Sequence, residues 1–159
     1  MSNVVNNDKV LFLITASYPF GKTETFIETE IRYLPKAFRK IVIISHDVYS
    51  THKREQTKSI EVIRMPYNLS NLEKLKSLIS LFDKKFWIEI QYIKKEYNKR
   101  ITFGILKTMF ISLYNAKRLS RIYKNIINIY GSKNALLYSY WSNDSALALS
   151  LLKLKDQNI

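Results

Sequence analysis

The sequence predicts an α/β fold with a mostly parallel sheet flanked by helices. Three observations lead to this prediction: a strand–helix–strand pattern over residues 9–45, a long helical stretch over residues 69–130, and a further strand–helix pair over residues 135–155. Two strands joined through a helix at this spacing require a right-handed parallel crossover. We expect one domain over residues 1–159.

The first elements are predicted from apolar patterning. Residues 9–15 (KVLFLIT) and 40–45 (KIVIIS) are continuous apolar runs, typical of strands buried on both faces, and residues 60–66 are a third run with more alternation. Residues 23–38 predict a helix that Thr23 or Thr25 caps and that Pro35 ends or bends. Its acidic residues, Glu24 among them, are expected on the solvated face.

The remaining chain is expected to be helical around one more strand. Residues 69–130 predict two or three helices, with Ser70 as the first cap, Gly104 as a break and residues 131–132 closing the region. Residues 135–141 (ALLYSYW) predict another buried strand, and residues 142–155 a helix capped by Ser142 or Asn143. Together these elements predict a Rossmann-like sheet.

The amino-acid composition limits the kinds of protein that this chain can be. The chain has 159 residues, 47% of them hydrophobic, and it has no cysteine, so disulfides and thiolate metal sites are excluded. We see no secretion signal and no apolar run of membrane-spanning length, and we expect a cytoplasmic protein. The formal net charge is +13, and residues 83–124 carry eleven Lys and Arg against three Asp and Glu. Nucleic acid, anionic lipid and phosphorylated ligands are all candidate partners of such a surface.

Residues 16–23 (ASYPFGKT) raise the question of a phosphate-binding P-loop, which would need glycine first and Gly-Lys-Thr last. Ala16 replaces the first glycine, Pro19 removes a backbone N–H, and Glu24 adds a negative charge. Ser45 follows the second strand where a magnesium-binding aspartate belongs. A P-loop nucleotide-binding module is therefore disfavoured.

Two patches carry a family resemblance. YPFGKTETFIETEIRYL followed by KIVIIS, and later LLYSYWSNDSALALSLLK, resemble the N-terminal domain of family 4 bacterial glycosyltransferases of the GT-B fold. The resemblance covers residues 9–45 and 135–153, near the two ends of the chain. It implies that the sheet is one half of a GT-B architecture.

In that family the N-terminal half holds the acceptor, and the C-terminal half holds the nucleotide sugar and a paired-glutamate motif. The resemblance thus implies transfer of a sugar from a nucleotide-sugar donor to a surface-polysaccharide or lipid-linked acceptor. This chain corresponds to the acceptor-side half alone, with the donor-binding domain absent, either as a piece of a longer protein or as a natural fragment. We expect it to need no cofactor of its own and to be inactive alone.

The resemblance places substrate-binding residues in the loop after the first strand, namely Tyr18, Gly21, Lys22 and Glu24. Each has a simpler interpretation: Gly21 serves a turn, Lys22 is a solvated charge, and Glu24 complements a helix dipole together with Glu28 rather than forming a carboxylate pair with it.

Tyr140 and Trp141 are the other candidates, either stacking on a sugar or packing in the core. Many family members have a histidine near this strand end, whereas the histidines here, His46 and His52, fall in a loop. We therefore assign no catalytic residue and no metal ligand.

The basic helical region favours an anionic membrane surface formed by Lys84, Lys85, Trp87, Lys94 and Lys95. The alternative is an ordinary amphipathic helix with solvated lysines. A nucleic-acid-binding module is the rival function, but the sequence has no zinc ligand set, aromatic RNP pattern or recognisable helix-turn-helix. We expect a peripheral protein at the inner face of the membrane, and a homo-oligomer, because a face that normally meets a second domain is exposed.

Overall fold

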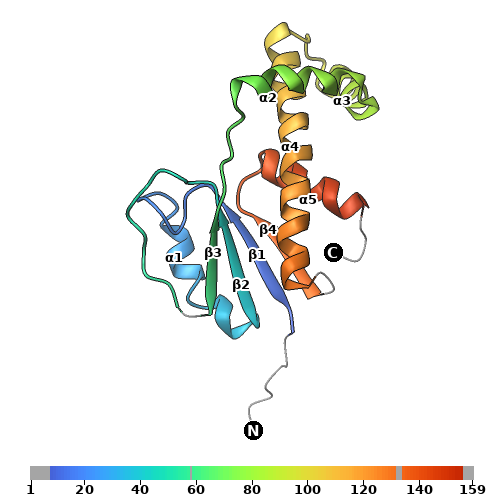
Figure 1. Ribbon diagram of the computed structural model, residues 1–159. Coiled ribbons are helices and arrows are strands. Elements are labelled where there is room, and N and C mark those ends of the chain that lie inside the picture. The colour runs from blue at the N-terminus through green and yellow to red at the C-terminus, as the bar shows by residue number, and fades with distance from the viewer. Residues whose placement is uncertain (1–7, 58, 132–133, 156–159) are drawn as a thin grey trace.

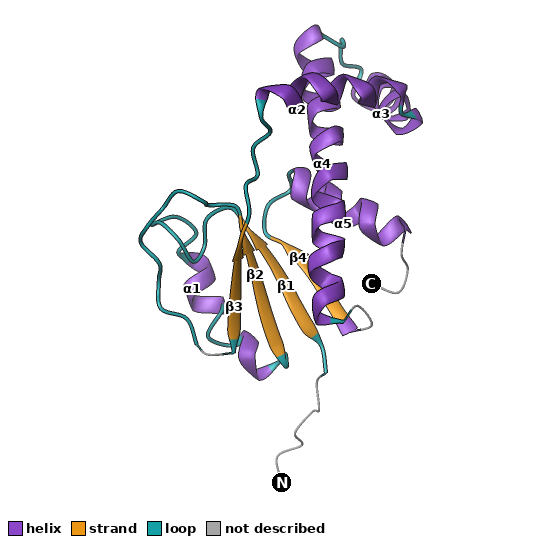
Figure 2. Ribbon diagram, in the orientation of Figure 1, coloured by secondary structure: helices purple, strands orange, loops and turns teal. Residues whose placement is uncertain are grey.

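A computed structural model describes residues 8–57, 59–131 and 134–155. Its centre is a sheet of four parallel strands in the order β3-β2-β1-β4, shown in Figures 1 and 2. The strands are β1 (Val10–Thr15), β2 (Lys40–Ser45), β3 (Ile60–Arg64) and β4 (Ala135–Ser139). Helices cover both faces, so the predicted Rossmann-like α/β fold is confirmed.

The two faces of the sheet bury alternate residues of each central strand. Leu11 and Leu13 of β1 face the short helix α1 (Phe26–Glu30) and the 3₁₀ turn η1 (Leu34–Lys36). Phe12 and Ile14 point to the other face, which α4 (Phe103–Tyr130) and α5 (Asp144–Lys155) cover. Both faces of β1 and β2 are buried, as their continuous apolar runs predict.

The helical middle forms a layer at one end of α4. Figure 1 shows the N-terminal half of α4 extending past the sheet, with α2 (Asn71–Lys76) and α3 (Lys84–Tyr97) lying across that end. The 3₁₀ segment η2 (Ser77–Phe82) joins the two helices. The cap predicted at Ser70 is confirmed, since its hydroxyl accepts from the Glu73 N–H and the Glu73 carboxylate accepts from the Ser70 N–H.

The helix predicted over residues 23–38 is much shorter in the structure. Glu24 has a φ of 56°, a left-handed conformation that a helix cannot include, and α1 begins after Thr25, whose side chain does not cap it. The helix α1 ends at Glu30, and Pro35 lies beyond it in the separate turn η1. Pro35 has no N–H to donate to the Ile31 carbonyl, so α-helical hydrogen bonding cannot continue through it toward residue 38.

Two further expectations are corrected at the later elements. The break between helices lies at Asn98, which adopts a left-handed φ of 47°, whereas Gly104 lies inside the first turn of α4. The strand β4 is not fully buried, because Leu136 and Tyr138 are 45% and 47% exposed. They pair with Leu11 and Leu13 of β1, on the face where α1 and η1 pack over the central strands and leave this edge strand open. As predicted, Asn143 caps α5 by accepting from the Ser145 N–H, and Gly131 ends α4; residue 132 lies outside the described residues.

Candidate functional site

The candidate site lies at the carboxyl ends of the strands. In an open parallel sheet, ligands bind in the crevice outside these ends, at the point where the strand order reverses. Here the order reverses between β1 and β4, since β2 and β3 follow β1 on one side and β4 lies on the other. Residues 16–25, 46–57 and 65–70 and residues 140–143 form the loops at this edge.

A buried carboxylate organises the first of these loops. The Oε2 atom of Glu24 accepts from the backbone N–H of Ser17 and of Tyr18, both at 2.7 Å, and Oε1 accepts from the N–H of Ala16 at 3.1 Å. The indole Nε1 of Trp141 donates to Oε1 at 2.6 Å. We call this arrangement, formed by Glu24, the N–H groups of residues 16–18 and Trp141, the Glu24 clasp.

The Glu24 clasp keeps its carboxylate ionised. Burial alone would raise the pKa of Glu24, but the hydrogen bonds from the Trp141 indole and from the three backbone N–H groups outweigh burial and hold the pKa below its ordinary value. Only 7% of Glu24 is exposed, so the expectation that it lies on a solvated helix face is wrong.

The Glu24 clasp also explains why this loop is not a phosphate site. Successive backbone N–H groups after the first strand of such a sheet form an anion-binding concavity. In this chain the concavity is filled from within, because the Glu24 carboxylate takes the N–H groups of residues 16–18. A phosphate at the same place would compete with a covalently tethered anion.

Aromatic side chains connect the Glu24 clasp to α1. The Phe26 ring meets Tyr140 and Trp141 edge to face, with centroids at 5.3 and 6.4 Å. The Tyr140 hydroxyl donates to Glu30, and burial, with that hydrogen bond, raises the Tyr140 pKa. Trp141 remains 45% exposed, so one part of its ring is open to a ligand while its N–H is fixed.

The loop after β2 is held against the loop after β1. Asp47 accepts from the backbone N–H of Tyr49 and Ser50 at 2.9 and 2.8 Å and from the Ser50 hydroxyl at 2.5 Å. Gly21, with a φ of 63°, donates its N–H to the carbonyl of His52 at 3.1 Å. The Arg54 guanidinium donates to the Gly21 carbonyl at 3.1 Å. Gly21 therefore serves a turn that joins two loops.

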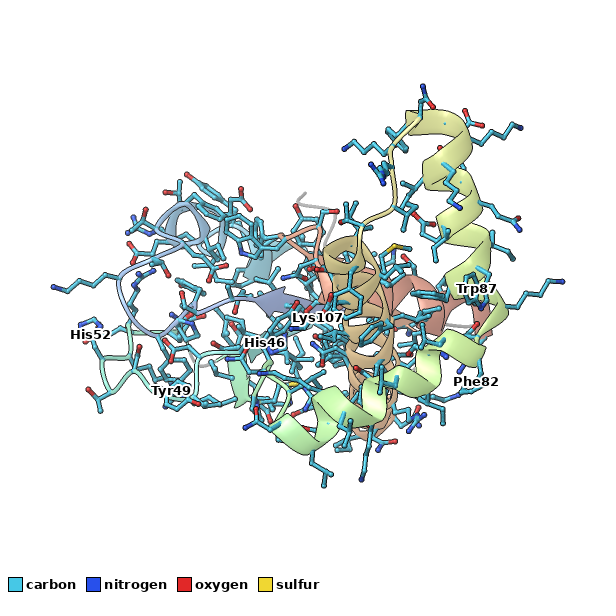
Figure 3. All side chains as sticks on the ribbon, turned by 90° about the horizontal axis from the view of Figure 1, so that it is seen from above. His46, Tyr49, His52, Phe82, Trp87 and Lys107 are labelled. Carbon is cyan, nitrogen blue, oxygen red and sulfur yellow. The ribbon has the colours of Figure 1, made fainter. Side chains whose placement is uncertain are left out.

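These loops line an open hollow of about 490 Å³ at the strand ends. We call it the edge pocket. Its lining combines two tyrosine rings with hydroxyl, amide and imidazole side chains and one carboxylate: Ala16, Ser17, His46, Asp47, Tyr49, Ser50, Tyr67, Asn68 and Asn143. Figure 3 shows His46, Tyr49 and His52 along this side of the molecule, with His52 farthest out.

His46 lines the edge pocket, although the sequence predicted only that it lies in a loop. It follows β2 directly, and its Nδ1 lies 3.3 Å from the carbonyl oxygen of Met65, which can only accept, so Nδ1 carries the hydrogen. Its Nε2 lies 3.0 Å from the Tyr123 hydroxyl and 3.1 Å from the Ser145 hydroxyl. Burial lowers the His46 pKa, and both ring nitrogens are engaged. His46 thus positions β2, α4 and α5 and is not free to act as a base.

A second set of hydrogen bonds, centred on Asp144 and Arg118, connects α5 and Tyr67 to α4. Asp144, in the first turn of α5, accepts from the Asn115 amide at 2.8 Å and from the Ser112 hydroxyl. Burial and the nearby Asp144 carboxylate raise the pKa of Tyr67 to about 12, so its hydroxyl stays protonated at neutral pH. Arg118 donates to the Tyr67 carbonyl at 2.8 Å.

The structure brings together four of the six substrate-binding candidates. Tyr18, Glu24 and Trp141 meet in the Glu24 clasp, and Tyr140 adjoins it through Phe26. The Tyr18 ring is only 1% exposed and its hydroxyl accepts from Gln56 at 3.0 Å, so this side chain belongs to the core. Lys22 lies apart, on an exposed turn.

The five residues predicted for the membrane surface lie on α3. Lys84, Lys85, Lys94 and Lys95 are exposed, and Trp87 is 51% exposed with its indole donating to the Leu81 carbonyl at 2.7 Å. Phe86 and Ile90 hold α3 on the main core. Large apolar side chains on α2, η2 and α3 are exposed as well: Leu72, Leu75, Leu78, Ile79, Phe82, Ile88, Tyr92 and Tyr97. We call the exposed side of these three segments the cap surface.

Comparisons with known proteins give no match: no family model matches the sequence, and no curated protein and no solved structure matches the chain. Within residues 8–57, 59–131 and 134–155, no helix is both long and apolar enough to cross a membrane.

Proposed function

We propose that this chain is the N-terminal, acceptor-side domain of a GT-B glycosyltransferase that moves a sugar from a nucleotide-sugar donor to a surface-polysaccharide or lipid-linked acceptor. The observation that carries the proposal is an edge pocket lined mainly by neutral side chains, with Asp47 as its one carboxylate, beside an anion cradle that Glu24 already fills. The side chains of the edge pocket suit a glycan, and the filled anion cradle disfavours a phosphate.

The chemistry of the edge pocket suits a sugar. A glycan presents many hydroxyl groups and apolar C–H faces, which pair with neutral hydrogen-bonding groups and with aromatic rings. The edge pocket offers the Asn68 and Asn143 amides and the rings of Tyr49 and Tyr67. A volume of about 490 Å³ lies in the ordinary range of ligand pockets.

The Glu24 clasp indicates which domain of the proposed enzyme binds the donor and which binds the acceptor. A nucleotide sugar carries a diphosphate, and the N–H groups that would bind it at the β1 end are occupied. In the proposed enzyme a second, C-terminal domain therefore binds the donor, and Trp141, half-exposed at the switch point, faces the acceptor side of the cleft. His46 shapes the pocket without acting as a base, because its Nε2 is engaged.

The cap surface extends the proposal to a membrane. It combines lysines with exposed aromatic and aliphatic side chains, the combination that binds an anionic bilayer through charge and shallow insertion. The bilayer would bring a lipid-linked acceptor to the enzyme from the cytoplasmic side.

The proposal is tested by saturation-transfer NMR with a panel of neutral mono- and oligosaccharides. We expect at least one glycan to bind in the millimolar range and to lose binding in Tyr49→Ala and Asn68→Ala. Both side chains are exposed, so neither variant should unfold the domain. Lys53→Ala, on the same loop but outside the edge pocket, is the control. Absence of binding by every glycan, or equal binding by all variants, contradicts the proposal.

A nucleic-acid-binding module remains the second candidate because of the net charge of +13. Binding of a specific nucleic-acid probe at physiological salt would favour this second candidate, because non-specific electrostatic binding is weakened at that salt concentration.

A further inference from the structure

A second cavity, of about 360 Å³, lies between η2 and α4, away from the edge pocket. We call it the η2–α4 pocket. Its lining has three basic and two acidic side chains, aromatic and apolar ones, and the buried Ser80: Lys117, Arg118, Arg121, Glu73, Asp83, Ile79, Phe82, Tyr114 and Ser80.

Ser80 is the unusual member of the η2–α4 pocket. The residue is 1% exposed, and its hydroxyl has no hydrogen-bond partner among the residues that the structure describes. A buried hydroxyl without a partner costs stability, so it is normally matched by a protein group or a ligand. The Ser80 oxygen is closed off from solvent, so a ligand in this pocket would meet it only after the side chain turns toward the pocket. An acceptor oxygen on that ligand would then give the hydroxyl a partner.

The charges around Ser80 are only partly balanced. Lys117 is paired with Asp83, which holds the pKa of Asp83 below its ordinary value, and Arg118 lies 3.6 Å from a Glu73 oxygen. Arg121 is exposed and makes no ion pair or hydrogen bond within the described part of the chain. The lining therefore retains one cation for an anionic ligand.

The rim of the η2–α4 pocket is apolar and belongs to the cap surface. Phe82 is 90% exposed and Ile79 is 66% exposed. Figure 3 shows Phe82 near the corner between η2 and α3, with Trp87 on the first turns of α3 beside it. A free phosphate would use none of this apolar surface, whereas an acyl chain attached to a phosphate would cover it.

We propose that the η2–α4 pocket binds the phosphate headgroup of an anionic lipid. The phosphate oxygens accept from the Ser80 hydroxyl and the Arg121 guanidinium, and the acyl chains contact Phe82 and Ile79. This inference rests on the membrane part of the proposed function and does not depend on sugar transfer. It assigns the cap surface a defined headgroup site in addition to diffuse charge.

Titration with a soluble short-chain phosphatidic acid, below its micelle concentration, tests the proposal by calorimetry. We expect saturable binding at one site, weakened about 10-fold or more in Ser80→Ala and in Arg121→Gln. Arg100→Gln removes the same charge from an exposed position outside the pocket and is the matched control, with unchanged affinity expected. Ser80→Ala removes no hydrogen bond, so its thermal midpoint should not fall.

Three outcomes would overturn the proposal. One is no binding of the short-chain lipid; another is equal weakening by Arg121→Gln and Arg100→Gln, which would indicate general electrostatics. The third is equal affinity for inorganic phosphate, which would mean that the apolar rim contributes nothing. Co-sedimentation with anionic vesicles is measured separately. If the chain binds anionic vesicles but not the short-chain lipid, the headgroup site is wrong and the membrane role of the cap surface is retained.

Discussion

Five donor groups converge on the Glu24 carboxylate: the N–H groups of residues 16, 17 and 18, the Ser17 hydroxyl and the Trp141 indole. The carboxylate links β1 to the end of β4, which are adjacent in the sheet but 117 residues apart along the chain at this contact. At the scale of single residues, Glu24 fixes the geometry of the switch point.

Replacing Glu24 with glutamine should destabilise the domain by about 2 to 3 kcal/mol, because the amide NH₂ would face backbone donors and the charged hydrogen bonds would be lost. Urea unfolding measures this loss. Glu28→Gln is the control, since that partly exposed carboxylate forms one ion pair with Arg54 and should cost less than about 1 kcal/mol. Equal losses of unfolding free energy in the two variants would show that the Glu24 clasp contributes no more to stability than an exposed ion pair.

His46 predicts a specific pH dependence of stability. Its folded-state pKa lies below its ordinary value of 6.5, chiefly through burial, with Arg118 lowering it further and the Met65 carbonyl and Glu24 opposing. As pH falls below about 6.5 the unfolded state binds a proton first, so the free energy of unfolding decreases until the folded-state pKa is passed. At higher pH the contribution is fully present.

Urea unfolding at pH 7.5 and pH 5.5 checks this, since both values lie above the range where carboxylates titrate. We expect lower stability at pH 5.5 for the wild type and for His52→Gln, whose side chain is exposed, and a smaller difference for His46→Gln. A wild type equally stable at both pH values would contradict the half-buried, hydrogen-bonded state of His46.

At the scale of elements, α3 carries the test of the cap surface. Reversing Lys84, Lys85, Lys94 and Lys95 to glutamate should abolish co-sedimentation with anionic vesicles, because each basic residue near such a surface contributes about 1 kcal/mol. The circular dichroism spectrum should not change, since these side chains are exposed. The control reverses four exposed lysines away from α3: Lys9, Lys22, Lys53 and Lys155. Equal loss in both variants would assign the attraction to net charge alone.

The elements were predictable wherever the pattern was local. The continuous apolar runs of β1 and β2 and the Ser70 cap depend on neighbouring residues, and the structure confirms them. The start of α1 was not predictable, because the left-handed Glu24 is held by Trp141, far along the chain.

The exposed face of β4 was missed for a related reason. An apolar run does not reveal whether a helix covers both sides of its strand, and here Leu136 and Tyr138 lie uncovered. The role of His46 shows the same limit. The sequence correctly places His46 in a loop, but it does not reveal that Met65, Tyr123 and Ser145 lie around its ring.

At the scale of the whole molecule, the uncovered face of β4 predicts self-association. Leu136 and Tyr138 sit on an edge strand beside a wide apolar hollow that β4 forms with α5. Exposed patches of this kind tend to find a partner, and an unpaired strand edge adds to the tendency. Sedimentation should show dimers or larger species at modest concentration, reduced in Leu136→Lys. A strictly monomeric profile up to high concentration would count against it.

The division between a sugar-binding edge pocket and a filled anion cradle is tested most directly by backbone-amide NMR. The chain is titrated in parallel with a binding neutral glycan and with UDP- and GDP-sugars. We expect the glycan to shift the amide signals of Tyr49 and Asn68, and we expect the nucleotide sugars to leave those of Ala16, Ser17 and Tyr18 unmoved and to undergo no transfer. Micromolar binding of a nucleotide sugar, with shifts at those three amides, would contradict the proposed acceptor-side role.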